Sequence, residues 1–244
     1  VGLGWGYAHE MGHNTVQRIM RITPNGTNGC VVECDNNILA SATAMRVLET
    51  LGVAVDNGHP LDYAGTYNDI IAARKLGLSN AAYLTEMQNR IWSSMGYQNK
   101  MRTLHFQLGF QFAKYRVGLN QPTMTSTLDY LALLTKGDRL VNKTFTVDSA
   151  SKYAMGRYTA ATAKTIANHD LLYVLSSKII GKDMRNIFWM YGIPLSNDAL
   201  NSVSDLGLAI APYSYYALPV GKHNTLTAGR WIDLSNNATP AWPF

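Results

Sequence analysis

Apolar residues recur at intervals of three and four positions along most of this 244-residue chain. That period is typical of amphipathic helices, which turn one apolar face toward a core. Only residues 208–220 and 225–234 look like strands, because Tyr, Val and Thr alternate there among apolar residues. The pattern therefore predicts a mainly α-helical fold with a small β element near the C-terminus.

The first two predicted helices lie close together in the sequence. One runs from Trp5 to Met20, and the turn-rich residues 23–29 end it. The second runs from Cys30 to Leu51, and a loop over 52–63 follows. The other helices are expected at 67–77, 80–95 (capped by Ser79), 99–116, 127–134, 164–180, 182–191 and 197–206 (capped by Ser196), with a loop over 117–125.

Composition indicates a folded protein. Hydrophobic residues make up 47% of the chain and charged residues 15%, a balance that excludes intrinsic disorder. The net charge of +5 comes from dispersed lysines and arginines, which excludes a basic arm that binds nucleic acid. No apolar run is long enough to cross a membrane, and no signal peptide is visible. If the protein is secreted, we expect its signal in an upstream part.

The sequence His-Glu-Met-Gly-His at residues 9–13 has the pattern H-E-x-x-H. On a helix, His9 and His13 stand four positions apart and project from one face, where both can bind a single metal ion. Glu10 stands beside them, where a carboxylate can take a proton from the attacking water. Two imidazoles and a glutamate in this pattern predict a zinc hydrolase.

Only eight residues precede His9, too few for the β-sheet that usually comes before the metal-binding helix in zinc peptidases of this type. We therefore expect this chain to be the C-terminal part of a longer protein, or to receive the remainder from a partner segment. The alternative is a compact enzyme that begins directly with its active-site helix.

A catalytic zinc ion needs a third protein ligand and one open position. A third histidine within an extended motif is excluded, because Val16 and Ile19 occupy the positions where glycine and histidine would stand. A second class uses an aspartate, and Gly65-Thr-Tyr-Asn-Asp69 matches its letters. That segment lies far downstream, so a loop that caps the following helix is the favoured interpretation of Asp69.

The third class takes a glutamate from the next helix. Glu33 follows His13 by twenty residues, just beyond the turn, so the two helices can pack as an antiparallel pair. Apolar neighbours indicate that Glu33 is buried, and a metal ion would compensate its charge. Asn37, one helical turn later, can accept the second ring N–H of His9 and fix its tautomer. The structural alternative is Glu33 paired with an arginine.

Cys30 and Cys34 are the only two cysteines. Their spacing on a helix brings the α-carbons into range of a disulfide but directs the β-carbons unfavourably, so we expect free thiols. A second zinc site is excluded, because the pair lacks further cysteine partners.

The residues around the motif resemble the enhancin-like family of zinc metallopeptidases, which are of the gluzincin type. The resemblance is carried by Trp5-Gly-Tyr-Ala-His-Glu-Met-Gly-His-Asn14 and by Glu33-Cys-Asp-Asn-Asn37. A later segment, Phe188-Trp-Met-Tyr-Gly-Ile-Pro-Leu-Ser196, is similar to that family's C-terminal helical region. The two cysteines around Glu33 depart from the family's pattern.

The resemblance implies a secreted or cell-surface enzyme that cleaves peptide bonds in O-glycosylated, mucin-type proteins. In this chain His9, His13 and Glu33 would bind Zn²⁺, Glu10 would be the general base, and Asn37 would orient a ligand. The oxyanion of the transition state would need a second donor. The candidates for this donor are His169, next to Asp170, and behind it Tyr173, Tyr213 and His223.

The resemblance also predicts how the chain is organised. Residues 1–244 would form the helical, C-terminal subdomain of a gluzincin catalytic region, and the upstream segment of the same protein would complete it. Within this region we expect a metal-binding helix pair at 1–51, a helical bundle at 52–206 and a small β or irregular element at 207–244.

Two other functions agree with the same residues. One is a degenerate peptidase domain that binds glycoproteins without cutting them, although the intact Glu10 argues against it. The other is a zinc hydrolase that acts on a substrate other than a peptide, because the metal site alone does not define the substrate.

Overall fold

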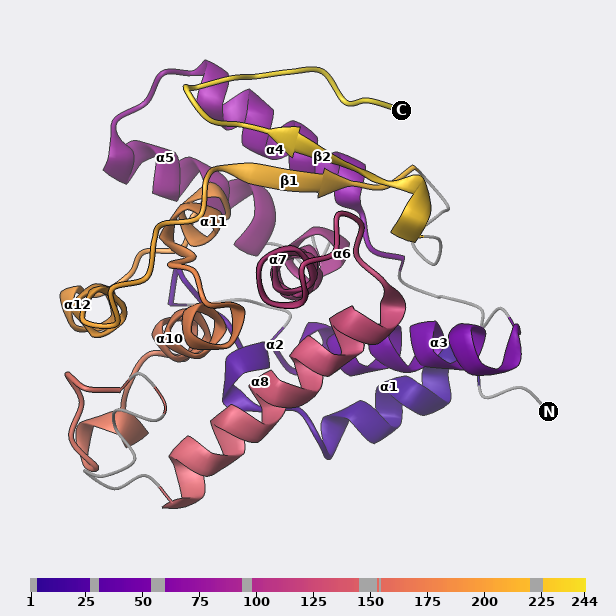
Figure 1. Cartoon of the computed structure of the whole chain (residues 1–244), viewed down its shortest axis with the longest axis horizontal. Helices are drawn as coiled ribbons and strands as arrows, with labels where there is room; N and C mark the ends of the chain where they lie inside the picture. Colours follow the sequence, from indigo (N-terminus) through magenta and orange to yellow (C-terminus); the bar gives the residue numbers. More distant parts are fainter. Residues whose placement is uncertain are drawn as a thin grey trace.

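The computed structural model describes residues 4–26, 31–53, 60–93, 98–144, 153, 155–219 and 226–244. Within these ranges the chain is mainly helical, and its one sheet has two strands near the C-terminus (Figure 1). The fold class predicted from the sequence is therefore confirmed. Among the described helices, none combines the length and the apolar character that a membrane span requires.

Helix α7 (Thr103–Phe112) lies at the centre of the molecule (Figure 1), and all of its residues are buried. Helices α6 (Gln98–Met101), α8 (Met124–Thr144) and α10 (Asn168–Ile180) pack against it. The amide of Gln107 bonds both the N–H and the carbonyl of Tyr216, at 2.9 and 2.8 Å. A polar residue thus joins the central helix to the sheet without leaving an unpaired group there.

Strands β1 (Ser214–Ala217) and β2 (Arg230–Asp233) are antiparallel, with Ser214 opposite Asp233. All four residues of β1 are buried against α4 (Tyr63–Lys75) and α7, whereas β2 is mostly exposed (Figure 1). The two strands are shorter than the sequence pattern predicts.

Helix α1 (Trp5–His13) ends seven residues earlier than predicted. The hydroxyl of Thr15 donates to the carbonyls of Met11 and Gly12, both at 3.3 Å, and so competes with a further helical turn. The chain then forms a short 3₁₀ turn, η1 (Arg18–Met20), where the carboxylate of Asp138 accepts the N–H of Ile19 at 3.3 Å. Tertiary contacts therefore override the apolar period of residues 14–20.

The second predicted helix is interrupted. It consists of a single turn, α2 (Val31–Cys34), and the longer α3 (Asn37–Leu51). At the break, the buried carboxylate of Asp35 accepts the N–H of Asn36 at 3.1 Å and pairs with Arg21 at 3.2 Å. Burial raises the pKa of Asp35 above its usual value, while Arg21 opposes this shift.

Two further boundaries differ from the prediction. Helix α4 begins at Tyr63 because the carboxylate of Asp62 accepts the N–H of Gly65 at 2.7 Å and caps it. Helix α8 runs through Gly137 and Asp138, since Gly137 packs beside Leu175 and Asp138 is engaged with Ile19. The remaining elements are α5 (Asn80–Met87), η2 (Gln88–Trp92), η4 (Ala113–Val117), η5 (Thr162–Lys164), α11 (Arg185–Met190), α12 (Asn197–Ser204) and η6 (Leu226–Ala228).

The predicted caps have different outcomes. The hydroxyl of Ser196 accepts the N–H of Ala199 at 3.2 Å and caps α12, as expected. Ser79 precedes α5 but its side chain makes no capping hydrogen bond.

The buried apolar core draws residues from all three predicted parts, 1–51, 52–206 and 207–244, and that division stays a prediction.

The expectation of free thiols is wrong for Cys34, which forms a disulfide and is buried. The expectation assumed that both cysteines lie on one continuous helix. The helix is interrupted after α2, so the geometry of a continuous helix does not apply to Cys34. Cys30 lies outside the described residues.

Helices α1 and α3 touch at Gly12. A β-carbon at this position would lie 2.9 Å from both the β-carbon and the carbonyl oxygen of Asn36. These distances are shorter than van der Waals contact, so the close approach requires glycine.

We expect Gly12→Ala to destabilise the fold by about 1–3 kcal/mol, because the added methyl group must push the two helices apart. Gly6→Ala on the same helix is the matched control, since its β-carbon would meet nothing within 4 Å. That control should be neutral or stabilise by up to about 1 kcal/mol. Urea denaturation of the two variants measures the difference, and equal stabilities would contradict the packing argument.

Candidate metal centre

Helix α1 carries three of the predicted site residues. His9 and His13 lie on one face of α1, with ring centroids 5.0 Å apart and ring planes nearly perpendicular. Glu10 stands between them and the solvent, with its two carboxylate oxygens 3.9 Å from His9 Nε2 and 4.0 Å from His13 Nε2. The ligand atoms of these three residues lie within 4.8 Å of one another, a grouping that could hold a metal ion.

The single turn α2 brings Glu33 to the same place. Its Oε2 atom lies 3.2 Å from His9 Nε2 and 3.7 Å from His13 Nε2. Ligand atoms bound tetrahedrally at 2.0–2.2 Å from zinc would be separated by roughly 3.3–3.6 Å. One oxygen of Glu33 therefore fits a common metal ion with both histidines.

Two glutamates adjoin the histidine pair, and the geometry separates them. Glu33 approaches both Nε2 atoms with a single oxygen, as a ligand does. Glu10 offers a different oxygen to each histidine at a longer distance, and 75% of its side chain is exposed. We therefore favour Glu33 as the ligand, with Glu10 beside the open position.

Asn37 fixes the orientation of His9. Its Oδ1 lies 2.6 Å from His9 Nδ1, which is the contact that the sequence predicted. In the tautomer that donates Nδ1–H to Asn37, Nε2 carries a lone pair that faces the Glu33 oxygen. Two acceptor atoms at this distance repel each other unless a proton or a metal ion lies between them. A doubly protonated His9 would donate Nε2–H to Glu33, whereas a metal ion between His9, His13 and Glu33 would also fit the 3.7 Å distance from His13 to the same oxygen.

Glu33 is not buried, contrary to the expectation. Its side chain is 55% exposed, and the adjacent Val32 is 61% exposed. The helix is broken at residues 35–36, so the burial expected for a continuous helix does not apply to Glu33. Within the described part of the chain, the carboxylates of Glu10 and Glu33 are therefore accessible to solvent.

The alternative assignments meet different partners. Asp69 binds Lys100 at 2.8 Å and Arg90 at 3.3 Å, and it lies within α4 rather than in a capping loop. The ion pairs of Glu33 recorded among the described residues are with the two histidines, and none is with an arginine.

Among the described residues, no hydrogen bond or ion pair joins a candidate oxyanion donor to His9 or His13. His169 is half-buried on α10, where burial lowers its pKa, and its catalytic role stays a prediction. The hydroxyl of Tyr173 is buried and donates to Asp183 at 2.7 Å. Tyr213 packs against Trp189 and Arg74. His223 lies outside the described residues.

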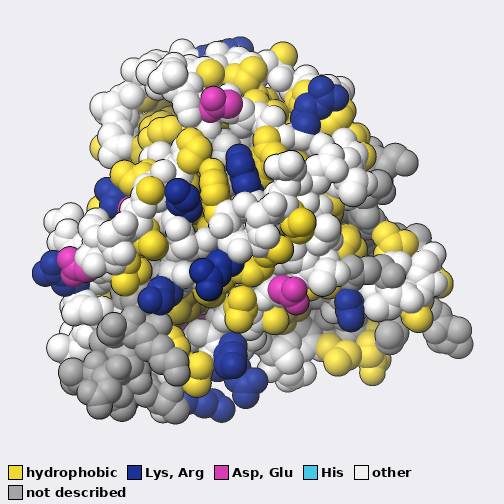
Figure 2. Space-filling view, in the orientation of Figure 1, with side chains coloured by type: hydrophobic (Ala, Val, Ile, Leu, Met, Phe, Trp, Pro, Cys, Tyr) yellow, Lys and Arg dark blue, Asp and Glu magenta, His cyan; other side chains and the backbone are white. Residues whose placement is uncertain are grey.

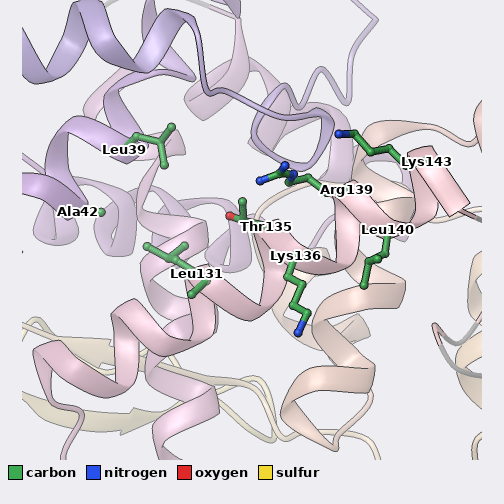
Figure 3. A pocket seen from close by; sticks show the side chains of 9 residues that line it. Leu39, Ala42, Leu131, Thr135, Lys136, Arg139, Leu140 and Lys143 are labelled. Atoms are coloured by element: carbon green, nitrogen blue, oxygen red, sulfur yellow. The ribbon is translucent and has the colours of Figure 1, made fainter.

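Two hollows border α3 and α8, away from the metal ligands. One, of about 890 Å³, is lined by the opposite face of α1, including Tyr7 and Met11, and by parts of α3 and α8. The other, of about 580 Å³, continues between α3 and α8, where Leu39 faces Leu131 (Figure 3). Figure 2 shows Lys and Arg side chains spread among apolar ones on the face where α8 lies, with few carboxylates.

The sequence and the fold are both similar to those of known metallopeptidases. A curated relative, the immunomodulating metalloprotease of Pseudomonas aeruginosa, is 29% identical over 250 residues. That alignment covers 99% of this chain and 25% of the relative. The resemblance predicted from the sequence is confirmed. No family model matches the chain.

Solved structures of the IMPa metallopeptidase have the same fold in the corresponding segment. The structure of the enzyme from Pseudomonas aeruginosa superimposes with a TM-score of 0.80, and a complex with T-antigen with 0.81. A third structure contains an O-glycopeptide and also has a TM-score of 0.80. Each is 24% identical in sequence and matches 99% of this chain, which spans 26% of the solved chain. The chain thus spans about a quarter of these relatives.

Sequence reasoning missed two residues that support the site. Asn36 donates its amide N–H to the carbonyl of His9 at 3.0 Å, and Arg102 reaches the carbonyl of Asn37 at 3.2 Å. The Asn36-Asn37 doublet is a local signal for the first. No local pattern points to Arg102, which arrives from a separate part of the sequence.

We expect Glu33→Ala to weaken zinc binding well beyond the roughly 10- to 100-fold effect of losing an outer hydrogen-bond partner, because a direct ligand is removed. Glu10→Gln is the matched control within the same cluster and should keep nearly the affinity of the unaltered protein. Competition with a fluorescent zinc chelator measures both variants. Full retention of zinc by Glu33→Ala would contradict the ligand assignment.

Proposed function

We propose that this chain carries the catalytic centre of a zinc metalloendopeptidase that hydrolyses peptide bonds in O-glycosylated proteins. The observation that carries the proposal is the convergence of His9, His13 and one oxygen of Glu33 on a common point. This donor set and spacing support a catalytic zinc site of the gluzincin type, with three protein ligands and one open position.

When bound, zinc lowers the pKa of water and polarises a carbonyl group. The exposed carboxylate of Glu10 stands at the open side of the site, where it takes the proton of the attacking water. It then passes this proton to the nitrogen of the leaving amine. Asn37 holds the ring of His9 in one orientation throughout, because its amide oxygen accepts the Nδ1–H.

The substrate class is supported by the relatives. One solved structure of the IMPa metallopeptidase contains T-antigen and another contains an O-glycopeptide. This chain shares their fold over nearly its whole length. We therefore propose an O-glycosylated, mucin-type protein as the substrate rather than an unmodified peptide.

We further propose that an upstream segment of the same polypeptide covers the back of α1. Tyr7 and Met11 project from the face of α1 opposite the ligands and are 61% and 56% exposed. They line the larger hollow together with Arg139, and none of the described residues that line it is acidic. An apolar segment with acidic residues would complement this surface. The chain spans about a quarter of its curated relative, in which such a segment could lie outside the aligned part.

We place the enzyme outside the reducing cytosol, as a secreted or cell-surface protein. The disulfide of Cys34 supports this location, because disulfides persist in oxidising compartments.

We expect Glu10→Gln to lower the rate of cleavage of a mucin-type glycoprotein by at least about 100-fold, since it removes the general base. Zinc content should stay unchanged, because Glu10 does not bind the metal in this assignment. The rate is measured by gel analysis of the intact glycoprotein, using the longer polypeptide that contains this chain. The same substrate after enzymatic removal of its O-glycans should be cut much more slowly.

Three results would contradict parts of this proposal. If the unaltered protein and the Glu10→Gln variant both retain zinc and leave the glycoprotein intact, the protease proposal fails and a binding module is favoured. Equal cleavage with and without glycans would contradict glycan-dependent recognition. If this chain alone cleaves as fast as the longer polypeptide, the upstream segment is not required.

We expect Cys34 to be oxidised in protein recovered from outside the cell. Alkylation of the unreduced protein followed by peptide mass analysis should leave Cys34 unlabelled, and labelling should appear after reduction. A fully alkylated Cys34 without reduction would contradict the proposed location.

A further inference from the structure

Arg102 is buried beneath the metal centre. Its side chain is only 1% exposed, and it immediately precedes α7, the central helix of the fold. Burial lowers the pKa of Arg102 to about 9, so its guanidinium keeps a positive charge at neutral pH. Burying a charge is costly unless the charge is hydrogen-bonded, which makes the contacts of this side chain informative.

The guanidinium of Arg102 joins several elements. It donates to the carbonyl of Asn37 at 3.2 Å and to the hydroxyl of Ser41 at 2.8 Å, both on α3. It also donates to Asn99 Oδ1 on α6 at 3.0 Å and lies over the ring of Trp5 on α1, 5.7 Å from its centroid. One side chain therefore links the start of the central helix to α1, which carries the two histidines, and to α3, which carries Asn37.

Arg102 bonds to the backbone of Asn37, the residue that orients His9. Asn37 is the first residue of α3, and its amide oxygen accepts the Nδ1–H of His9 at 2.6 Å. The first residues of a helix are not held by bonds from a preceding turn, so their side chains follow any movement of the backbone. Fixing the Asn37 carbonyl therefore fixes the acceptor that His9 uses.

We propose that Arg102 is a positioning residue of the metal centre, which acts on His9 through Asn37. This inference rests on the proposed function, because it assigns His9 as a zinc ligand. Loss of an outer hydrogen-bond partner of a histidine ligand typically weakens metal affinity roughly 10- to 100-fold. Arg102 acts one step further out, so we expect its substitution to cost about tenfold.

The test is a double-mutant cycle with zinc affinity as the readout. Arg102→Met should weaken zinc binding about tenfold in the otherwise unaltered chain. In the Asn37→Ala background the same substitution should have almost no further effect, because no amide is left to position. Arg102→Lys keeps the charge but loses the planar fork, so its zinc affinity should lie between those of the unaltered chain and of Arg102→Met. Arg102→Lys also replaces Arg102→Met in the cycle if that variant folds poorly.

Arg74→Met is the matched control for a general loss of stability. The guanidinium of Arg74 likewise donates to a backbone carbonyl, that of Leu234 at 2.6 Å, and lies over an aromatic ring, that of Tyr213. Its contacts are with the C-terminal region rather than with α1 or α3. Thermal denaturation should show destabilisation in both variants, whereas zinc affinity should fall only for Arg102→Met.

The Co²⁺-substituted protein provides a second readout, because its visible absorption spectrum depends on ligand geometry. Arg102→Met should change this spectrum and Arg74→Met should not. Equal losses of zinc affinity in the two Asn37 backgrounds, or an effect of Arg74→Met as large as that of Arg102→Met, would overturn the positioning role. An unaltered chain that binds no zinc would instead contradict the proposed function itself.

Discussion

The metal centre depends on the close approach of α1 to the start of α3. At Gly12 the two backbones come so near that a β-carbon would overlap Asn36. This proximity lets Asn36 reach the carbonyl of His9 and lets Asn37 reach its ring. Both contacts act on the same histidine, one through the backbone and one through the side chain. A ligand atom can therefore be held in place on a helix whose outer face is open to solvent.

Buried polar residues lie behind the exposed carboxylates of the candidate site. Glu10 and Glu33 are largely exposed, yet the residues behind them, from Asp35 to Asn37, are almost fully buried. Arg102 extends this buried layer to the central helix. Because buried polar groups are costly when unpaired, each of these contacts restricts the geometry that the others can adopt. This arrangement combines exposed carboxylates with buried residues that hold His9 in one orientation.

Much of the fold could be predicted from the period of apolar residues, because amphipathic helices and a short hairpin bury their apolar faces in almost any compact arrangement. The boundaries could not. Helix α1 stops at His13 because Thr15 binds its last carbonyls, and α8 passes through Gly137 because Leu175 packs there. Such contacts join residues that are distant in sequence or that compete locally with the helix. The period alone therefore does not record them.

The sequence by itself determined the arrangement of three candidate site residues: His9, Glu10 and His13 are fixed in relation to one another by one helical turn, whatever surrounds them. The choice between Glu33 and Asp69 was open at that level, because spacing does not show which carboxylate meets the histidines. Tertiary structure favours Glu33, because it places the Glu33 carboxylate beside His9 and His13 and places Asp69 between Lys100 and Arg90. It also brings Arg102 to the carbonyl of Asn37, and only packing joins residues so far apart along the chain.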